Sequence, residues 1–371
     1  MIILTVNAGS SSIRLSAFAQ KGNGIEKLAA SKYNRGEDSS LIIETFIQDY
    51  KIKEVSIIAH RIVHGGTKFV NSCLIDTAVE KEIECLSSLA PLHNPFALEW
   101  IQICRATFSG HIPQIAVFDT AFYSTLPEIA TIYAIPQNIC KQYHIRRYGF
   151  HGIAHQALWK RWNELCPDLK NGGRVISLQL GAGCSITAVH HGKAVDTSMG
   201  FSPLEGLVMA TRSGDIDPSV ILYLQRSYRF SRDMVEKMLN CFSGLLGVSE
   251  ISGNIQELLE SNLPEAQLAV KLFCYRIRKY IGAYLAVLGG ADAILFGGGV
   301  GENAPIVRKL ILENMDWLGI ILDLQANNAI IGKEGCINSS MSKIEVWVIP
   351  VDEASVLAQE AIEVIKKGLN E

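Results

Sequence analysis

The sequence predicts an α/β fold in which one domain plan occurs twice. Strand patterns alternate with helical patterns along the 371 residues, as is typical of sheets layered with helices. A strand, a turn of small residues and a second apolar alternation occur near the start and again in mid-chain, with Ala8-Gly9-Ser10-Ser11 matching Ala182-Gly183-Cys184-Ser185. Such self-similarity about half a chain apart indicates a duplicated domain.

In the first half of the chain, apolar patterning predicts strands at residues 2–6, 13–17, 55–59 and 115–118. Small residues from Asn7 to Ser12 form the turn between the first two strands. Thr77 and Glu80 have the spacing of a capping box, which predicts a helix that starts at Thr77 and stops at Pro91.

In the second half, strands are expected at residues 175–180, 186–189, 293–296 and 346–349. A long helical pattern runs from Pro264 to about Leu288, and another runs from about Glu353 to Lys367. Ligand loops are expected at the carboxyl ends of the strands, because that edge is where α/β sheets bind their ligands.

Composition describes a globular protein with a large core, since 48% of the residues are apolar and 19% are charged. Lys and Arg number 34 against 37 Asp and Glu, so no global positive field is available for nucleic acid or an anionic membrane. We therefore expect a small molecule as the partner.

Nine cysteines without a CxxC pair favour reduced thiols over a disulfide framework or a zinc cluster. The apolar start of the chain is too short for a signal peptide, and glycines interrupt the longest apolar stretch. The expected compartment is the cytoplasm.

Three loops of small residues follow predicted strands, at residues 7–12, 181–185 and 297–301. Such loops let backbone N–H groups approach phosphate oxygens without a Cβ in the way. Each alone is more often a tight turn, but three in one chain indicate a polyphosphate held between two domains. None has the lysine of a P-loop.

Charged residues in unusual settings supply the other needs of phosphoryl transfer, which are cations for the phosphate oxygens and carboxylates for magnesium. Arg61 directly follows a strand, and Arg212 lies in a glycine-containing loop. Asp119 and Glu353 each come after a strand. Taken singly, such an arginine is more often part of an ion pair and such a carboxylate is as often a helix cap. His93 and His151 are also weak evidence when taken singly, because core histidines bonded to the backbone are common.

Eight motifs in order and spacing resemble the acetate kinase family over essentially the whole chain. They are Asn7-Ala8-Gly9-Ser10-Ser11-Ser12, His60-Arg61-Ile62-Val63-His64-Gly65-Gly66, Ala90-Pro91-Leu92-His93-Asn94-Pro95, Phe118-Asp119-Thr120-Ala121-Phe122, Arg147-Tyr148-Gly149-Phe150-His151-Gly152, the segment from Asp196 to Leu207, the segment from Thr211 to Pro218, and Gly298-Gly299-Val300-Gly301-Glu302-Asn303.

The resemblance implies two duplicated ribonuclease-H-like domains of the actin-like ATPase kind on either side of a central cleft. The first would span residues 1–149, completed by a C-terminal helix at 353–371, and the second, with the nucleotide site, residues 150–352. It implies a homodimer and reversible, Mg²⁺-dependent phosphoryl transfer from ATP to acetate, giving acetyl phosphate and ADP, with Mn²⁺ as a substitute metal.

The resemblance also implies residue roles. Asn7, Asp119 and Glu353 would organise magnesium, Arg61 would bind the acyl or phosphoryl group, and His151 and Arg212 would stabilise the transition state. The acyl substrate would be bound with the help of Val63, Leu92, His93, Phe150 and Pro203. The nucleotide would be bound by Ser10, Ser12, Arg14, Gln179, Leu180, Gly181, Ala182, Gly183, Asn254, Ile255, Gln256, Gly299, Val300, Gly301, Glu302 and Asn303. Acetate is already ionised near neutral pH, so Asp119 is expected to align the reactants and the metal and not to act as a base.

This chain departs from the family pattern on the donor side alone. Arg14 replaces a lysine, Gln179 a histidine and Ala182 an asparagine, and Asn254-Ile255-Gln256 stands where the family has an aspartate and an arginine. We therefore expect weak and poorly selective nucleotide use, with ATP as the donor and GTP or pyrophosphate competing.

Three alternatives remain open. The chain could prefer propionate or butyrate, because one methylene changes discrimination by only ~1–3 kcal/mol. It could use pyrophosphate in place of ATP. It could also be a catalytically weak, nucleotide-binding regulatory protein of the same fold.

Overall fold

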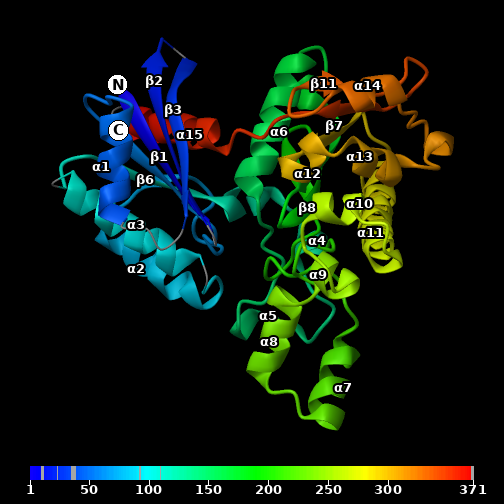
Figure 1. Ribbon diagram of the computed structural model, residues 1–371. Helices are drawn as coiled ribbons and strands as arrows, with labels where there is room; N and C mark the ends of the chain where they lie inside the picture. The colour runs from blue at the N-terminus through cyan, green and yellow to red at the C-terminus, as the bar shows by residue number, and fades with distance from the viewer. Residues whose placement is uncertain (10–11, 23, 35–38, 92, 109, 369–371) are drawn as a thin grey trace. The chain divides into compact units, whose positions relative to one another are not determined.

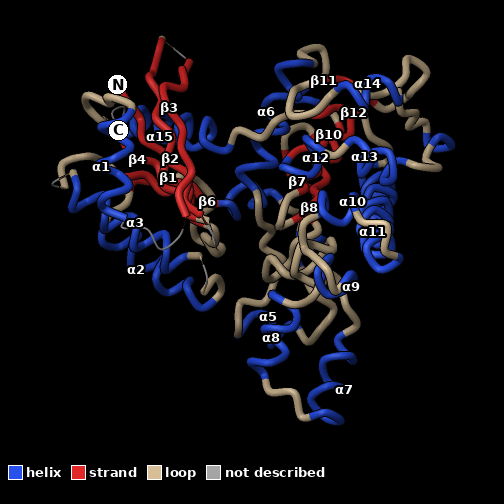
Figure 2. Tube along the Cα trace, in the orientation of Figure 1, coloured by secondary structure: helices blue, strands red, loops and turns tan. Residues whose placement is uncertain are grey.

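The computed structural model describes residues 1–9, 12–22, 24–34, 39–91, 93–108 and 110–368. The chain forms two compact units. Unit 1 comprises residues 1–124, 150–157 and 352–371, and unit 2 comprises residues 125–149 and 158–351. Each unit contains a six-stranded sheet, drawn in red in Figure 2. The α/β class predicted from the sequence is therefore confirmed.

Unit 1 is a sheet covered by helices on both faces (Figure 1). Its elements are β1 (Ile2–Ala8), β2 (Ser12–Lys21), β3 (Gly24–Asn34), α1 (Ser39–Asp49), β4 (Ile57–Ile62), β5 (Cys73–Leu74), α2 (Thr77–Cys85), α3 (Asn94–Thr107), β6 (Gln114–Phe118), the first half of α6 (Gly152–Leu165) and α15 (Glu353–Gly368). Alternate residues of β1 point to opposite faces. Leu4 packs with Phe46 of α1 and Trp100 of α3, whereas Ile3 packs with Leu357 of α15.

Unit 2 contains the rest of α6 and the longest described helix. Its elements are α4 (Glu128–Thr131), α5 (Gln137–Gln142), β7 (Arg174–Leu180), β8 (Cys184–His190), β9 (Lys193–Thr197), α7 (Pro218–Tyr228), α8 (Arg232–Cys241), α9 (Gly244–Ser249), α10 (Ile255–Glu260), α11 (Pro264–Leu288), β10 (Ala293–Gly297), α12 (Gly298–Asn303), α13 (Pro305–Leu312), α14 (Leu324–Ala329), β11 (Gly335–Cys336) and β12 (Glu345–Val348). Helix α11 packs on β7 and β8.

The two sheets have the same topology. Their strand orders are β3-β2-β1-β4-β6-β5 and β9-β8-β7-β10-β12-β11. In both, three parallel strands form the centre, and the strand on each side of them, β2 and β5 or β8 and β11, runs antiparallel to its central neighbour. The outermost strand, β3 or β9, runs antiparallel to β2 or β8. This equivalence confirms the duplicated plan that the repeated turn motif predicted.

Several local expectations are corrected by the structure. Asp76 caps α2 by accepting a hydrogen bond from the Val79 amide at 2.8 Å, so Thr77 is the first helical residue and not the cap. The helix ends at Cys85, before the expected Pro91. Asn7 lies inside β1 and not in a turn, and Gly298 to Asn303 form the short helix α12 and not an open loop.

All nine cysteines are free thiols. Within the described residues, no helix combines the length and the apolarity that crossing a bilayer would require.

Candidate active site

The parallel strands of unit 1 bring predicted site residues to one edge of the sheet. Asn7 and Arg61 lie near the ends of β1 and β4, and Asp119 directly follows β6. Val6 pairs with His60 across β1 and β4, so the next residues of these strands, Asn7 and Arg61, are neighbours. Glu353 is the first residue of α15, which packs on β1, β4 and β6.

Arg61 is the centre of this cluster. Its Nη2 and Nε donate to Asp119 Oδ2 at 2.6 and 3.1 Å, and its Nη1 donates to Asn7 Oδ1 at 3.1 Å. Glu353 Oε2 lies 3.8 Å from Nη1 of Arg61 and accepts a 2.6 Å hydrogen bond from Asn7 Nδ2. The four side chains therefore form one connected polar group.

Burial makes the charges of this group interdependent. The Asp119 side chain is 1% exposed, and the side chains of Arg61 and Glu353 are each 13% exposed. Burial raises the pKa of the Asp119 carboxyl, and the Arg61 guanidinium opposes that rise. For Arg61, burial disfavours the charge, but Asp119 and Glu353 outweigh it and raise the pKa. Each charge thus depends on its partner.

Asp119 keeps one oxygen available. Its Oδ1 is buried and has no hydrogen-bond partner of acceptable geometry among the described residues, although the Ile153 backbone amide lowers the pKa of the carboxyl. A buried acceptor of this kind points to a missing ligand. A cation would satisfy it.

Two of the predicted acyl-side residues of unit 1, Val63 and Phe150, lie near the end of β4. Val63 follows β4 and is buried, and Phe150 is 1% exposed with its ring 5.5 Å from that of His64. His151 adopts the left-handed region with φ 58° and His93 precedes α3. Such a φ in a residue other than glycine often marks a functional site.

Asn94 is a functional candidate that the sequence reasoning passed over. Its side chain is fully buried, accepts from the His64 amide at 3.1 Å and donates to the His64 carbonyl at 3.0 Å. It therefore fixes the backbone just after Val63. The signal was available, because Asn94 stands inside the motif Pro91-Leu92-His93-Asn94-Pro95.

Part of the predicted site lies outside the described residues, namely Ser10 and Leu92. Ser12 opens β2, and Arg14 of β2 is exposed. Arg14 pairs directly with Asn7 of β1. It therefore lies on the sheet face that carries the Arg61 cluster.

In unit 2, two predicted phosphate loops approach each other at one edge of the sheet. Gly297 of β10 pairs with Gln179 of β7. At Gly298, with φ 77°, a Cβ would come within 2.6 Å of the Leu180 carbonyl oxygen, so only glycine fits. Gly181 donates to the Gly183 carbonyl at 3.1 Å and closes the turn around Ala182. Gln179 Oε1 is buried without a hydrogen bond among the described residues.

Arg212 belongs to the same region of unit 2. Ala210 donates to the Ala182 carbonyl at 3.0 Å, which fastens the Arg212 loop to the phosphate loop. Arg212 donates to the Pro203 carbonyl at 3.1 Å and forms no ion pair with any described carboxylate. Burial lowers its pKa. A partly buried guanidinium with only neutral partners is suited to an anion.

Asn254 and Gln256 have local structural contacts. Asn254 caps α10, accepting from the Gln256 amide at 3.0 Å and contacting Glu257 at 3.2 Å. The Gln256 side chain contacts Glu260 at 3.2 Å, and Ile255 is buried. These contacts account for the two polar side chains without a nucleotide.

Arg308 and Glu302 hold the glycine-rich segment from Gly298 to Asn303 in place. Arg308 is fully buried on α13 and donates to the carbonyls of Gly301 and Glu302 at 2.8 and 3.1 Å. Glu302 accepts from the Gly298 and Val351 amides at 2.9 and 3.1 Å. The sequence reasoning missed Arg308, whose signal was an arginine on an otherwise apolar helix face. Gly299, Val300 and Asn303 complete the segment, where Asn303 donates to the Gly299 carbonyl at 2.9 Å.

Comparison with known proteins supplies the context for this geometry. The profile of the acetokinase family matches residues 27–359. The chain belongs to the acetokinase family. Its similarity to acetate kinase from Chloroherpeton thalassium is 45% identity over 321 residues, which cover 85% of this chain and 77% of that protein.

Solved structures agree with the acetokinase assignment. A crystal structure of Porphyromonas gingivalis acetate kinase superposes with a TM-score of 0.89 at 34% identity, covering 98% of this chain and 99% of that chain. A propionate kinase from Francisella tularensis superposes with a TM-score of 0.88 at 34% identity, with the same two coverages. The predicted family and the duplicated actin-like fold are confirmed, and the chain is a phosphotransferase of the carboxylate-accepting class.

Proposed function

We propose that the protein acts as an acetate kinase, transferring a phosphoryl group reversibly from ATP to acetate to give acetyl phosphate and ADP. The observation that carries this proposal is the buried group of Asn7, Arg61, Asp119 and Glu353 in a chain of the acetokinase family. Phosphoryl transfer is catalysed by positioning and by fixed charge, and this group supplies both.

The chemistry needs no general base. An acetate oxygen attacks the terminal phosphorus of ATP, a C–O–P linkage forms, and the bond from that phosphorus to the departing ADP oxygen breaks. Because acetate is ionised near neutral pH, no proton must be removed. Asp119 therefore serves alignment, Arg61 binds the substrate carboxylate or the transferring group, and His151 and Arg212 stabilise charge on the phosphoryl oxygens.

The residues around Asp119 fit a magnesium ion. Asp119 offers a buried oxygen without a hydrogen bond, Glu353 offers a second carboxylate, and Asn7 offers an amide whose oxygen and nitrogen exchange places on rotation. We assign Asn7, Asp119 and Glu353 to Mg²⁺, or to Mn²⁺ in its place. The bound metal would neutralise phosphate charge.

The described residues contain no group of three or more His, Cys, Asp or Glu side chains suited to a metal. The proposed magnesium site uses two carboxylates, and Mg²⁺ is usually held by one or two carboxylates together with water and substrate phosphates.

For the donor, we propose weak and poorly selective nucleotide use, with ATP as the main donor and GTP or pyrophosphate competing. Gln179 cannot become cationic as histidine can, and Ala182 lacks a side-chain donor. Asn254 and Gln256 are bonded within α10. A lost hydrogen bond to a charged group is worth about 1.5–3 kcal/mol, or roughly one to two decades of affinity.

Back-substitution tests the donor proposal. The double variant Gln179→His, Ala182→Asn should lower the KM for ATP at least roughly tenfold and leave the KM for acetate unchanged. Gln325→His, at an exposed position of α14, is the matched control. An unchanged KM for ATP in the double variant, or tight and strictly ATP-specific kinetics in the wild type, contradicts the proposal.

Propionate or butyrate is the second candidate acceptor. The similarity to the Francisella propionate kinase structure is almost as close as that to the Porphyromonas acetate kinase structure. A difference of one methylene is small enough for closely similar folds to differ in acyl preference.

We further propose a homodimer and a cytoplasmic location. Unit 2 exposes apolar side chains on and beside α4, α5, α7 and α8, which a second copy of the chain would cover. They are Ile129, Ile132, Ile139, Tyr143, Leu222, Tyr223, Tyr228, Met234 and Phe242. Light scattering on purified protein tests the dimer, and a monomer at micromolar concentration contradicts it.

A hydroxamate assay for acyl phosphate tests the main proposal. Purified protein with Mg²⁺ is given ATP, GTP or pyrophosphate against acetate, propionate or butyrate, and chelation of the metal is the control. We expect the highest turnover with ATP and acetate. Absence of acyl phosphate with every pair, and of ATP from acetyl phosphate and ADP, would leave the regulatory alternative.

A further inference from the structure

The long loop between β9 and α7 carries two predicted site residues, Pro203 and Arg212. Residues 198–217 contain no helix or strand. Arg212 donates to the Pro203 carbonyl at 3.1 Å, so the two positions are coupled. A loop of this length inside a compact domain is usually functional and needs anchors to hold one conformation.

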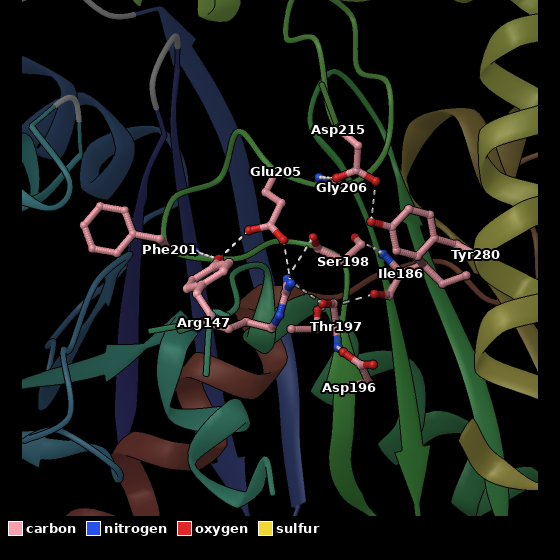
Figure 3. Close-up of polar contacts among 11 residues, drawn as sticks. Arg147, Ile186, Asp196, Thr197, Ser198, Phe201, Glu205, Gly206, Asp215 and Tyr280 are labelled. Carbon is pink, nitrogen blue, oxygen red and sulfur yellow. Dashed lines mark hydrogen bonds and ion pairs between the residues drawn. The ribbon is translucent and has the colours of Figure 1, made fainter. Parts of the chain in front are cut away.

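The first anchor consists of Arg147 and Tyr133, which bind the side chain of Glu205, two residues after Pro203 (Figure 3). Arg147 Nη2 contacts Glu205 Oε1 at 2.5 Å, and Arg147 Nη1 donates to the carbonyls of Thr197 and Ser198 at 3.0 and 3.2 Å. The Tyr133 hydroxyl donates to the other oxygen of Glu205. Charge-assisted bonds of this kind are the strong ones.

The same anchor holds the main chain just before Pro203. The Phe201 amide donates to the Tyr133 hydroxyl oxygen at 2.8 Å. A Cβ at Gly200 would lie 1.6 Å from Glu205 Oε2 and 2.1 Å from the Tyr133 hydroxyl. Both side chains are therefore packed directly against the backbone at Gly200. Tyr133 and Glu205 thus fix the chain on both sides of Pro203.

A second anchor holds the Arg212 end of the loop. Asp215 accepts from the Gly206 amide at 2.9 Å and from the Tyr280 hydroxyl at 2.7 Å, and its own amide donates to the Gly206 carbonyl at 2.9 Å. Figure 3 shows Asp215 between Gly206, the residue that follows Glu205, and Tyr280. The second anchor therefore ties the Arg212 end of the loop to the residue after Glu205, and the Tyr280 hydroxyl takes no part in the bonds that Arg147 and Tyr133 make to Glu205.

We infer that Tyr133 and Glu205 are positioning residues that determine acyl-chain selectivity by fixing Pro203, the predicted wall of the acyl pocket. The inference rests on the proposed function. A wall held from both sides admits a methyl group and rejects a longer chain, and such a pocket discriminates one methylene by roughly 10–200-fold. If Pro203 is held less firmly, it can move aside and the pocket can accommodate the longer acid.

The test is a selectivity ratio in Tyr133→Phe and Glu205→Gln. The first removes the hydroxyl that joins Glu205 to the Phe201 amide, and the second removes the charge that Arg147 binds. We expect the ratio of kcat/KM for acetate to that for propionate to fall about 3- to 10-fold in each, mainly through KM. The KM for ATP should change less than twofold.

Two tyrosine-to-phenylalanine controls lie on α11. Tyr280→Phe loosens the Arg212 end, so it should lower kcat for both acids by the same factor and leave the ratio unchanged. Tyr275→Phe, at an exposed side chain, should change nothing. Thermal melting of all four variants identifies any that fail to fold, and either Tyr133→Phe or Glu205→Gln suffices for the test.

An unchanged ratio in a folded and active Tyr133→Phe or Glu205→Gln overturns the inference, as does an equal fall in the Tyr280→Phe control. Failure of the proposed function is distinguishable, because the wild type would then form no acyl phosphate from any acid.

Discussion

Arg212 is a cation with neutral partners, which a folded protein keeps only at a cost. Its guanidinium donates to the Pro203 carbonyl and lies 3.9 Å from the sulfur of Met209, and burial lowers its pKa. Ionisable groups whose pKa is perturbed by burial are concentrated at functional sites. The role proposed above for Arg212, stabilising charge on the phosphoryl oxygens, would account for this cost in stability.

We predict that Arg212→Ala lowers kcat by roughly 10³-fold or more, in line with other cations that stabilise phosphoryl transfer. The melting temperature should stay the same or rise, because a partly buried charge without a counter-ion is removed. Turnover in the hydroxamate assay and thermal melting measure the two effects. Near wild-type turnover would remove Arg212 from the site.

Arg61 should respond differently, because it neutralises Asp119. Arg61→Ala should lower kcat by a similar factor and also destabilise the protein by ~3 kcal/mol, since the buried Asp119 charge loses its partner. Adding Asp119→Asn should restore stability without restoring turnover. Stability unaffected by Arg61→Ala would show that the pair carries no net structural role.

At the scale of elements, the start of α6 is packed against the chain that carries Asp119. A Cβ at Gly152 would lie 1.9 Å from the Asp119 carbonyl oxygen and 2.8 Å from Phe122 Cβ. Only glycine lets the helix begin so close to that backbone. The next amide, that of Ile153, acts on the Asp119 carboxylate.

We predict that Gly152→Ala destabilises the protein by ~1–3 kcal/mol and lowers kcat by about tenfold or more, because the helix must move away from Asp119. Gly282→Ala is the matched control, since Gly282 lies in α11 with nothing within 4 Å of its would-be Cβ. That change should stabilise by ~0.5–1 kcal/mol. Denaturant unfolding and the hydroxamate assay measure both variants, and equal behaviour of the two would contradict this interpretation.

At the scale of the whole molecule, three buried histidines give the stability a pH dependence. Burial lowers the pKa of His60 to about 4, that of His64 to about 4 and that of His155 to about 3. An unfolded histidine has a pKa near 6.5, so the unfolded chain binds more protons between these values. The contribution of each neutral histidine is complete above about pH 6.5 and is lost as the pH falls toward 4.

We therefore predict that the free energy of unfolding falls between pH 6.5 and 4, by up to ~3 kcal/mol for each of the three histidines. His60→Gln should flatten the decline, whereas His111→Gln, at an exposed position, should not. Denaturant titrations at several pH values measure the slope. An identical slope in His60→Gln and the wild type would contradict the assignment.

The class and the duplicated plan of the fold could be predicted from the sequence, because both depend on local patterns of apolar and small residues. The period of the apolar residues predicted α11 from Pro264 to about Leu288, as the structure has it. The repeated turn motif predicted a duplicated domain plan, which the structure shows as two sheets of the same strand order. The motif order predicted the family. The sequence-based prediction was less accurate at the ends of elements. At the start of α2, Asp76 is the N-cap in place of Thr77, because its carboxylate accepts a hydrogen bond from the Val79 amide.

The contacts among the predicted site residues, in contrast, become visible only in the folded chain. Nothing in the sequence shows that Arg61 joins Asp119, Asn7 and Glu353, since β1, β4, β6 and α15 are distant in the chain and meet only through sheet register and packing. For the same reason the supports of the site stayed hidden, among them Arg308 behind the glycine segment and the Tyr133 hydroxyl on Glu205. Periodicity records which face of an element is buried, whereas a contact between distant side chains exists only once those faces have packed.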